Sequence, residues 1–212
     1  MQFNQTNNNK GDVNNAISEN GNVVQNLMKN AGDTSAKERL FIDDIESFSK
    51  VRDVTTATVA PLLKGGYLDV AEDMVQNALE EILAVVLHKK DWGGEVNDLY
   101  TANVLVDGGR RATAFLLKGN GLTAKTMEIK HCGKNGDQVV RLFQSPADLF
   151  VIQFVGNISE AVIQHAHGEI ARQKTQGKEA HFLIVDGQDT ARLLFAYGKL
   201  ARPASLPAQP SS

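Results

Sequence analysis

The sequence of 212 residues contains a single cysteine, Cys132, so no disulfide bond can form within the chain. Chains without internal disulfides are typical of reducing compartments, and the sequence therefore predicts a cytoplasmic protein. No apolar run reaches the roughly 18 residues that a transmembrane helix needs. The first residues are polar and lack the charged and then apolar layout of a secretory signal. We therefore expect no membrane partner.

The chain also lacks a strong net charge. Its formal charge of −3 argues against a protein that coats nucleic acid indiscriminately. The charge is unevenly spread, however, because residues 108–141 contain seven basic and two acidic residues. That segment is therefore +5, and the rest of the chain is −8. A local basic face on an acidic body is compatible with binding to phosphate groups.

What the sequence does have is the composition of a globular protein, with 42% hydrophobic and 22% charged residues. Its first 30 residues are different, since they contain ten asparagines and few large apolar side chains. Such a segment cannot bury enough surface to offset the entropy of ordering it. One interpretation is a disordered leader. The other is a polar β element, turning at Asn20 and Gly21, that orders only by pairing with other copies and so makes a homo-oligomer.

Helix signals dominate the residues that follow the leader. Ser35 and Glu38 form a capping-box pattern, and Phe41, Ile45 and Phe48 follow at helical spacing, so we expect a helix there. A second helix is expected over 54–64, where two glycines end it. The predicted division is a leader or oligomerising element at 1–33, a helical extension at 34–66, a core at 67–201 and a disordered tail at 202–212.

The core alternates helices and strands. A cap signal at Asp69 and Glu72 opens a helix to about residue 88. Strands are expected at 100–106 and 112–117 around a turn at 107–109, with a third short strand at 126–130. After a short helix, "DLFVIQFVG" and "HFLIVDG" read as strands covered on both faces. Each is followed by a helix, the last one capped by Asp189. This order predicts an α/β fold with a mixed central sheet flanked by helices.

The hairpin places acids at its entrance and a lysine at its far end. Asp98 begins the first strand and Lys118 ends the second, and in an antiparallel hairpin those two ends lie side by side. Glu95 lies three residues before Asp98. Carboxylates are the ligands that Mg²⁺ or Mn²⁺ prefers, and a nearby lysine can stabilise charge that develops on a phosphate. An ordinary solvated hairpin with an ion pair at its ends gives the same pattern.

Four stretches of the chain carry a family resemblance: "GGEVND", "FLLK", "LFVIQFVGNISEAVIQHAH" and "FLIVDGQDTARLLFAY". In their order, residues 70–200 resemble the PD-(D/E)xK nuclease superfamily and, within it, the Mrr-type restriction endonucleases. The resemblance implies a restriction-endonuclease-like fold and Mg²⁺- or Mn²⁺-dependent cleavage of nucleic acid, above all DNA. It also implies a role in bacterial restriction or antiphage defence, with a partner protein of the defence system.

The sequence departs from the family motif at one position. If Lys118 is the motif lysine, Leu116 stands where the family has a carboxylate or glutamine, and leucine cannot bind a metal ion. Either another acid supplies the ligand, such as Glu95 or Glu128, or the site is inactive. An inactive protein would keep the nuclease fold as a module for nucleic-acid binding or oligomeric assembly.

A second register matches the motif more literally. In "MEIK", Glu128 and Lys130 are the motif acid and lysine, and Asp107 is the upstream acid. We favour the register with Asp98 and Lys118, because Asp107 falls in the turn of the hairpin. The two registers can share one face if their strands are adjacent, so a mixed site remains open.

Basic and polar residues near the hairpin are candidates for binding the substrate backbone. In "GKNGDQVVRL", glycines and an asparagine suit a loop whose amides face a phosphate, and a surface turn before a helix gives the same pattern. The histidines and the cysteine show no zinc spacing. The predicted substrate-binding residues are Arg110, Arg111, Lys125, Lys134, Asn135, Gln138 and Arg141.

Overall fold

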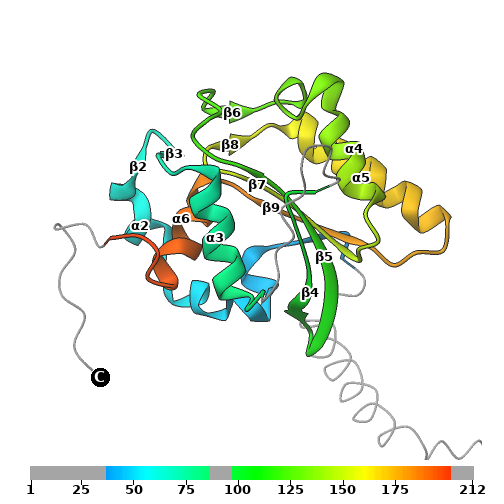
Figure 1. Ribbon diagram of the computed structural model, residues 1–212, viewed down its shortest axis with the longest axis horizontal. Coiled ribbons are helices and arrows are strands. Elements are labelled where there is room, and N and C mark those ends of the chain that lie inside the picture. Colours follow the sequence, from blue (N-terminus) through cyan, green and yellow to red (C-terminus); the bar gives the residue numbers. More distant parts are fainter. Residues whose placement is uncertain (1–36, 86–96, 202–212) are drawn as a thin grey trace, which may run out of the picture. The chain divides into compact units, whose positions relative to one another are not determined.

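The structure, a computed structural model, describes residues 37–85 and 97–201 (Figure 1). They belong to the second of the two units into which the chain divides, Met1–Ser35 and Ala36–Ser212. A five-stranded mixed sheet lies at the centre, in the order β1-β9-β7-β5-β4. Its strands are β1 (Arg39–Leu40), β4 (Leu99–Val106), β5 (Gly109–Lys118), β7 (Leu149–Phe154) and β9 (His181–Val185). The predicted α/β class with a mixed central sheet flanked by helices is confirmed.

Within this five-stranded sheet, only the hairpin of β4 and β5 is antiparallel. The pairs β5 with β7, β7 with β9 and β9 with β1 are all parallel. Helix α4 (Asp137–Gln144) connects β5 to β7, and helix α5 (Glu160–Thr175) connects β7 to β9. Every residue of β7 and β9 is buried, as expected of parallel strands that are covered on both faces.

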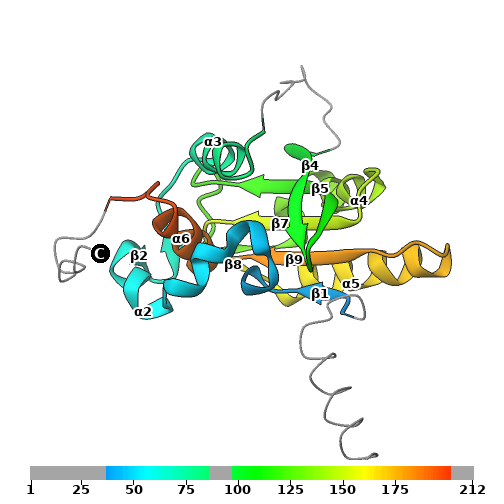
Figure 2. The same cartoon turned by 90° about the horizontal axis from the view of Figure 1, so that it is seen from below.

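Helices cover both faces of the sheet (Figures 1 and 2). On one face lie α3 (Glu72–Ile82), α6 (Gly187–Ala196) and the 3-10 segment η2 (Glu46–Asp53), whose apolar side chains pack against β5, β7 and β9. On the other face lie α4 and α5, where the rings of Phe143 and Phe150 are 4.6 Å apart. In the part of the chain that is described, no helix is both long and apolar enough to span a bilayer.

The two segments predicted as helices between residues 36 and 64 are not continuous α-helices. Residues 39–40 form β1 instead, followed by η1 (Ile42–Asp44) and η2, a short helix α2 (Thr56–Val59) and η3 (Ala60–Leu62). The buried residues Ile42, Ile45, Phe48 and Val51 recur every third position, and this period matches the three residues per turn of a 3-10 helix. Phe41 is out of phase with them and 56% exposed. The backbone of β1 pairs instead with β9 at the open edge of the sheet.

Three smaller expectations also need correction. The glycines after residue 64 turn a small hairpin, β2 (Leu63–Lys64) and β3 (Tyr67–Leu68). The third strand is only β6 (Thr126–Met127), and it pairs with β8 (Asn157–Ile158) in a separate two-stranded sheet. Helix α6 is capped by Asp186 and not by Asp189, since the Asp186 carboxylate accepts the amides of residues 188 and 189 at 2.9 Å each.

An ion cluster fastens the start of the described chain to α5. The Glu38 carboxylate lies 3.0 Å from Nζ of Lys174 and 3.3 Å from Nδ1 of His167. The hydrogen bonds from Lys174 and then His167 hold the pKa of Glu38 below its usual value. A lowered folded-state pKa means that Glu38 stabilises the fold above its unfolded pKa, and that this stability is lost as the pH falls through the folded value.

We therefore expect Glu38→Gln to lower the free energy of unfolding at pH 7 by about 0.5 kcal/mol, a small effect because the pair is exposed and screened. The difference in melting temperature between the two proteins should shrink as the pH is lowered from 7 to 3, because protonation of the wild-type carboxylate removes its contribution. Calorimetric melting at both pH values measures this. A melting difference at pH 3 as large as that at pH 7 would contradict the assignment.

Candidate functional site

The ends of β4 and β5 that the sequence singled out lie side by side. Leu99 of β4 is opposite Phe115 of β5, and the amide of Asp98 donates to the Phe115 carbonyl at 2.9 Å. Oδ2 of Asp98 accepts the backbone N–H of Leu117 at 2.6 Å. Asp98 is therefore held beside the residue that directly precedes Lys118. Glu95, the other predicted acid at this entrance, lies outside the described residues.

Glu72 joins these residues from the first turn of α3. Its Oε2 lies 3.7 Å from Nζ of Lys118, whose side chain is 16% exposed. Sequence reasoning treated Glu72 as a capping partner of Asp69, but the N-cap is Ala71 and the helix begins at Glu72 itself. One feature of the sequence could have identified Glu72. It is an acidic residue in the first turn of the helix that precedes the strand beginning at Asp98.

The charges of these three residues act on one another. Burial raises the pKa of the Glu72 carboxyl, the positive charge of Lys118 opposes that rise, and the negative charge of Asp98 adds to it. Two carboxylates near each other in a partly buried place repel, and a cation relieves that repulsion. Lys118 supplies one positive charge, and a bound metal ion would supply more.

Gly119 allows α3 to approach the end of β5. A Cβ at this position would lie 2.1 Å from the amide nitrogen of Glu72 and 2.6 Å from the carbonyl carbon of Ala71. The amide of Gly119 also donates to the Glu72 carboxylate. Next to it, the amide of Asn120 donates to the Val70 carbonyl at 2.8 Å. The loop after Lys118 is therefore fixed against the start of α3.

An open pocket of about 610 Å³ lies at this place. Its volume is within the usual range for small-molecule sites, and its lining is mixed polar and apolar. The lining residues are Ala71, Glu72, Asp73, Gln76, Lys118, Asn120, Gly121 and Leu122. A ligand in this pocket would meet both the Glu72 carboxylate and the Lys118 ammonium group.

Leu116 does not supply a polar group to the site. It is two residues before Lys118, on the same face of β5, and is 3% exposed within the hydrophobic core. Within residues 37–85 and 97–201, no group of three or more His, Cys, Asp or Glu residues is arranged to hold a metal ion. Among the described residues, the carboxylates at the strand ends that could serve as donors are those of Asp98 and Glu72. Such a set fits Mg²⁺, which usually takes one or two protein carboxylates and completes its shell with water and substrate phosphates.

The literal motif "MEIK" forms a different local arrangement. Oε2 of Glu128 pairs with Nζ of Lys130 at 2.7 Å, and both side chains are at least half exposed. Hydrogen bonding and the charge of Lys130 lower the pKa of Glu128. Its proposed partner Asp107 occupies the hairpin turn at the other end of β4, roughly 30 Å along the strand from Asp98. The structure does not bring Asp107 to the strand end where Lys118 lies.

Two of the predicted substrate-binding residues are remote from Lys118. Arg110 and Arg111 begin β5 beside the hairpin turn, and Arg111 pairs with Glu179 at 3.4 Å.

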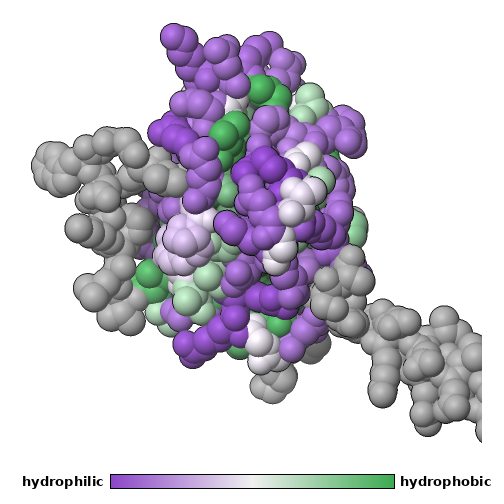
Figure 3. Space-filling view, turned by 90° about the vertical axis from the view of Figure 1, so that its right-hand side faces the viewer, coloured by the Kyte–Doolittle hydropathy of each residue, from purple (hydrophilic) through white to green (hydrophobic). Residues whose placement is uncertain are grey.

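Figure 3 shows a face of the molecule that is mostly hydrophilic, with its hydrophobic residues in small groups. The exposed large hydrophobic residues of the described chain are Phe41, Met74, Tyr100 and Leu105.

The other predicted contacts come after β5. Lys125 directly precedes β6, and Lys134 and Asn135 lie in the 3-10 turn η5 (Lys134–Gly136). This turn follows Cys132, whose pKa burial raises to about 11 while the charge of Lys118 opposes the rise. Gln138 and Arg141 continue into α4, and Arg141 pairs with Asp137 at 3.2 Å.

Comparisons of this chain with protein-family models, with curated proteins and with solved structures found no match. What the protein does must therefore be inferred from the residues at the strand ends.

Proposed function

We propose that the protein is a metal-dependent nuclease-like protein that acts on nucleic acid, with Glu72, Asp98 and Lys118 as its reacting groups. The observation that carries this proposal is that Glu72 and Lys118 pair at the wall of an open pocket, near enough to Asp98 for its charge to act on Glu72. Charged groups in this combination suit the hydrolysis of a phosphodiester.

Each residue has a role that its surroundings support. Glu72 and Asp98 would hold Mg²⁺ or Mn²⁺, which supplies Lewis-acid stabilisation and lowers the pKa of a bound water. Lys118 would donate hydrogen bonds to the attacked phosphate and stabilise its developing charge. The bond from the Leu117 amide keeps the Asp98 carboxylate oriented.

Charge favours one direction of approach for the substrate. Residues 69–85 contain five acidic residues and no basic ones, so the surface of α3 repels phosphates. Lys125 and Lys134 lie in the loops that follow β5. The nucleic acid, DNA above all, would therefore approach from the side of these loops rather than across α3.

Leu116 favours a second candidate, a catalytically inactive nuclease-fold module for nucleic-acid binding or oligomeric assembly. It fills the motif position with a buried apolar side chain. Such a module would bind nucleic acid or a partner without depending on Asp98. A cytoplasmic role in restriction or antiphage defence, with a partner protein, and a homo-oligomer built through residues 1–33 stay predictions from the sequence.

Cleavage assays distinguish the two candidates. We expect the purified full-length chain to cut plasmid, linear or single-stranded DNA, or RNA, with Mg²⁺ or Mn²⁺ and not with EDTA. Asp98→Asn and Lys118→Met should each lower the initial rate about 100-fold or more. Glu128→Gln, an exposed acid that also pairs with a lysine, is the matched control and should retain the wild-type rate.

The other outcomes are equally informative. Loss of cleavage only in Glu128→Gln would move the site to the "MEIK" motif. Absence of cleavage under all conditions, together with nucleic-acid binding that Asp98→Asn leaves intact, would reject the nuclease in favour of the binding module.

A further inference from the structure

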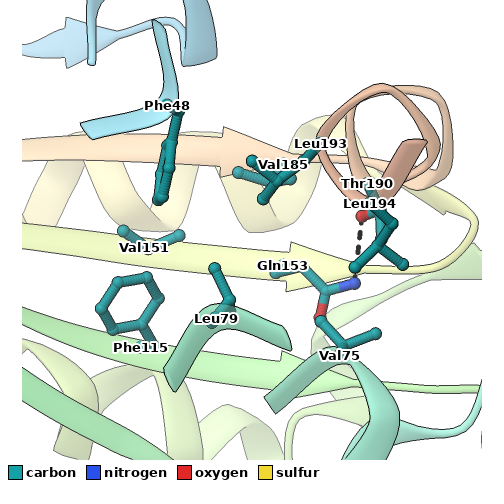
Figure 4. A pocket seen from close by; sticks show the side chains of 10 residues that line it. All are labelled: Phe48, Val75, Leu79, Phe115, Val151, Gln153, Val185, Thr190, Leu193 and Leu194. Atoms are coloured by element: carbon teal, nitrogen blue, oxygen red, sulfur yellow. Dashed lines mark hydrogen bonds between the residues drawn. The ribbon is translucent and has the colours of Figure 1, made fainter. Parts of the chain in front are cut away.

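Gln153 is a polar residue in the middle of an otherwise apolar strand. It lies in β7, the central strand of the sheet, and is 2% exposed. Burying an amide side chain costs free energy unless its groups are hydrogen-bonded. Both ends of Gln153 are used: Oε1 accepts the backbone N–H of Lys118 at 3.3 Å, and Nε2 donates to Oγ1 of Thr190 at 3.1 Å (Figure 4).

Side chains add to the strand pairing at the end of β5, where Leu117 lies opposite Gln153 and Lys118 lies opposite Phe154 of β7. The amide of Leu117 donates to the Asp98 carboxylate on the β4 side, and the amide of Lys118 donates to Gln153 on the β7 side. The carbonyl of Lys118 accepts the amide of Val155 at 3.2 Å. The Gln153 side chain therefore helps to fix the backbone of Lys118, together with the pairing of β5 with β7.

Thr190, in helix α6, holds the side chain of Gln153 by a hydrogen bond. Thr190 is 1% exposed and lies in the second turn of α6. The start of that helix is anchored to the sheet, because the amide of Gly187 donates to the Gly156 carbonyl at 2.8 Å. A Cβ at Gly187 would lie only 2.4 Å from the carbonyl oxygen of Val155. Thr190 is thus a fixed point against which Gln153 is oriented.

Solvent cannot replace these hydrogen bonds. Gln153 and Thr190 line an enclosed cavity of about 10 Å³ whose other walls are apolar side chains of α3, α6, η2 and the sheet (Figure 4). This volume holds one water molecule at most. Loss of either hydrogen bond would therefore leave a buried polar group unsatisfied.

We infer that Gln153 and Thr190 are positioning residues for Lys118, linking α6 to the candidate site through the chain Thr190, Gln153 and the Lys118 amide. The inference rests on the proposed function only where it calls Lys118 a reacting group. Neither residue is expected to touch the substrate. Their effect on the reaction is the placement of the Lys118 ammonium group beside Glu72.

The test compares Thr190→Val, which removes the hydroxyl at nearly constant shape, with Thr190→Ser, which keeps it. Thr113→Val is the matched control, because Thr113 is also buried and its hydroxyl bonds the Arg111 carbonyl in the same strand β5. In the full chain, hydrogen exchange of the Lys118 amide is followed by NMR, and kcat and KM are measured for cleavage with Mg²⁺.

In Thr190→Val we expect about tenfold faster exchange of the Lys118 amide, with exchange in β9 unchanged, and about tenfold lower kcat at unchanged KM. Thr190→Ser should restore both values, and Thr113→Val should leave the Lys118 amide as in the wild type.

Three results would overturn the inference: unchanged exchange at Lys118, faster exchange throughout the sheet, or an active enzyme whose kcat does not fall. Selective loosening of Lys118 that serine rescues, in a chain that cleaves no substrate, would support the positioning by Gln153 and Thr190 and reject the nuclease. The failure of the positioning inference and the failure of the proposed function are thus separate results.

Discussion

Gly119→Ala is expected to lower the free energy of unfolding by about 3 kcal/mol and the melting temperature by roughly 10 °C. The reason is steric, because the new methyl group would meet the backbone of Ala71 and Glu72 at 2.6 Å or less. Backbone atoms cannot rotate away as the end of a long side chain can. Either α3 moves outward or the loop after Lys118 does, and both changes separate Glu72 from Lys118.

Gly121→Ala is the matched control for this change. Gly121 lies two residues further along the same loop, and a Cβ there would meet no atom within 4 Å. Neither glycine has a positive φ, so the two substitutions differ in space and not in backbone strain. The control should change the free energy of unfolding by less than about 0.5 kcal/mol. Chemical denaturation measures both, and equal destabilisation would show that α3 does not pack on Gly119 as described.

Glu72→Gln is expected to lower the cleavage rate about 100-fold or more while leaving the folded protein at least as stable at neutral pH. Burial raises the folded-state pKa of Glu72, and the charge of Lys118 does not fully offset it. For an acid with a raised pKa, stability is highest when it is protonated and falls as the pH rises from the unfolded to the folded value. Glutamine does not ionise and avoids that loss.

The gain in stability is small, a few tenths of a kcal/mol, because the Glu72 side chain is 43% exposed and solvent screens it. It should appear at pH 8 and vanish below about pH 4, where Glu72 is protonated in both states. Glu81→Gln, at an exposed acid of the same helix that pairs with Lys199 and not with Lys118, is the control and should retain cleavage. A Glu72→Gln variant that cleaves at the wild-type rate would remove Glu72 from the site.

The strands that the sequence predicted well are those whose burial is uniform. Every residue of β7 and β9 is apolar or is held by tertiary contacts. A continuous run of β-branched and aromatic residues is typical of a strand that is covered on both faces of the sheet. The segment from Ile42 to Val51 failed because an apolar spacing of three is close to the helical spacing of 3.6. The segment is short and lies beside the sheet. It forms 3-10 turns, with the edge strand β1 before it, in place of the predicted helix.

At the candidate site, the hairpin pattern placed Asp98 and Lys118 at neighbouring strand ends, and no local pattern placed Glu72 beside them. Asp98 and Lys118 are the two ends of one hairpin, so antiparallel pairing alone predicts that they meet. Glu72 comes from a helix that packs on the hairpin. Its contact with Lys118 depends on the bare backbone of Gly119, a condition that no local pattern reveals.

By itself, the sequence determined the fold class, the hairpin and the proximity of one acid to one lysine, because alternation and turn residues act over neighbouring positions. The tertiary structure alone decided that Glu72 completes the cluster and that the "MEIK" motif pairs within itself. It alone decided that Gln153 and Thr190 hold the end of β5. These are contacts between residues far apart in the chain, and they form only when the sheet and its covering helices exclude water and leave one set of hydrogen-bond partners in reach.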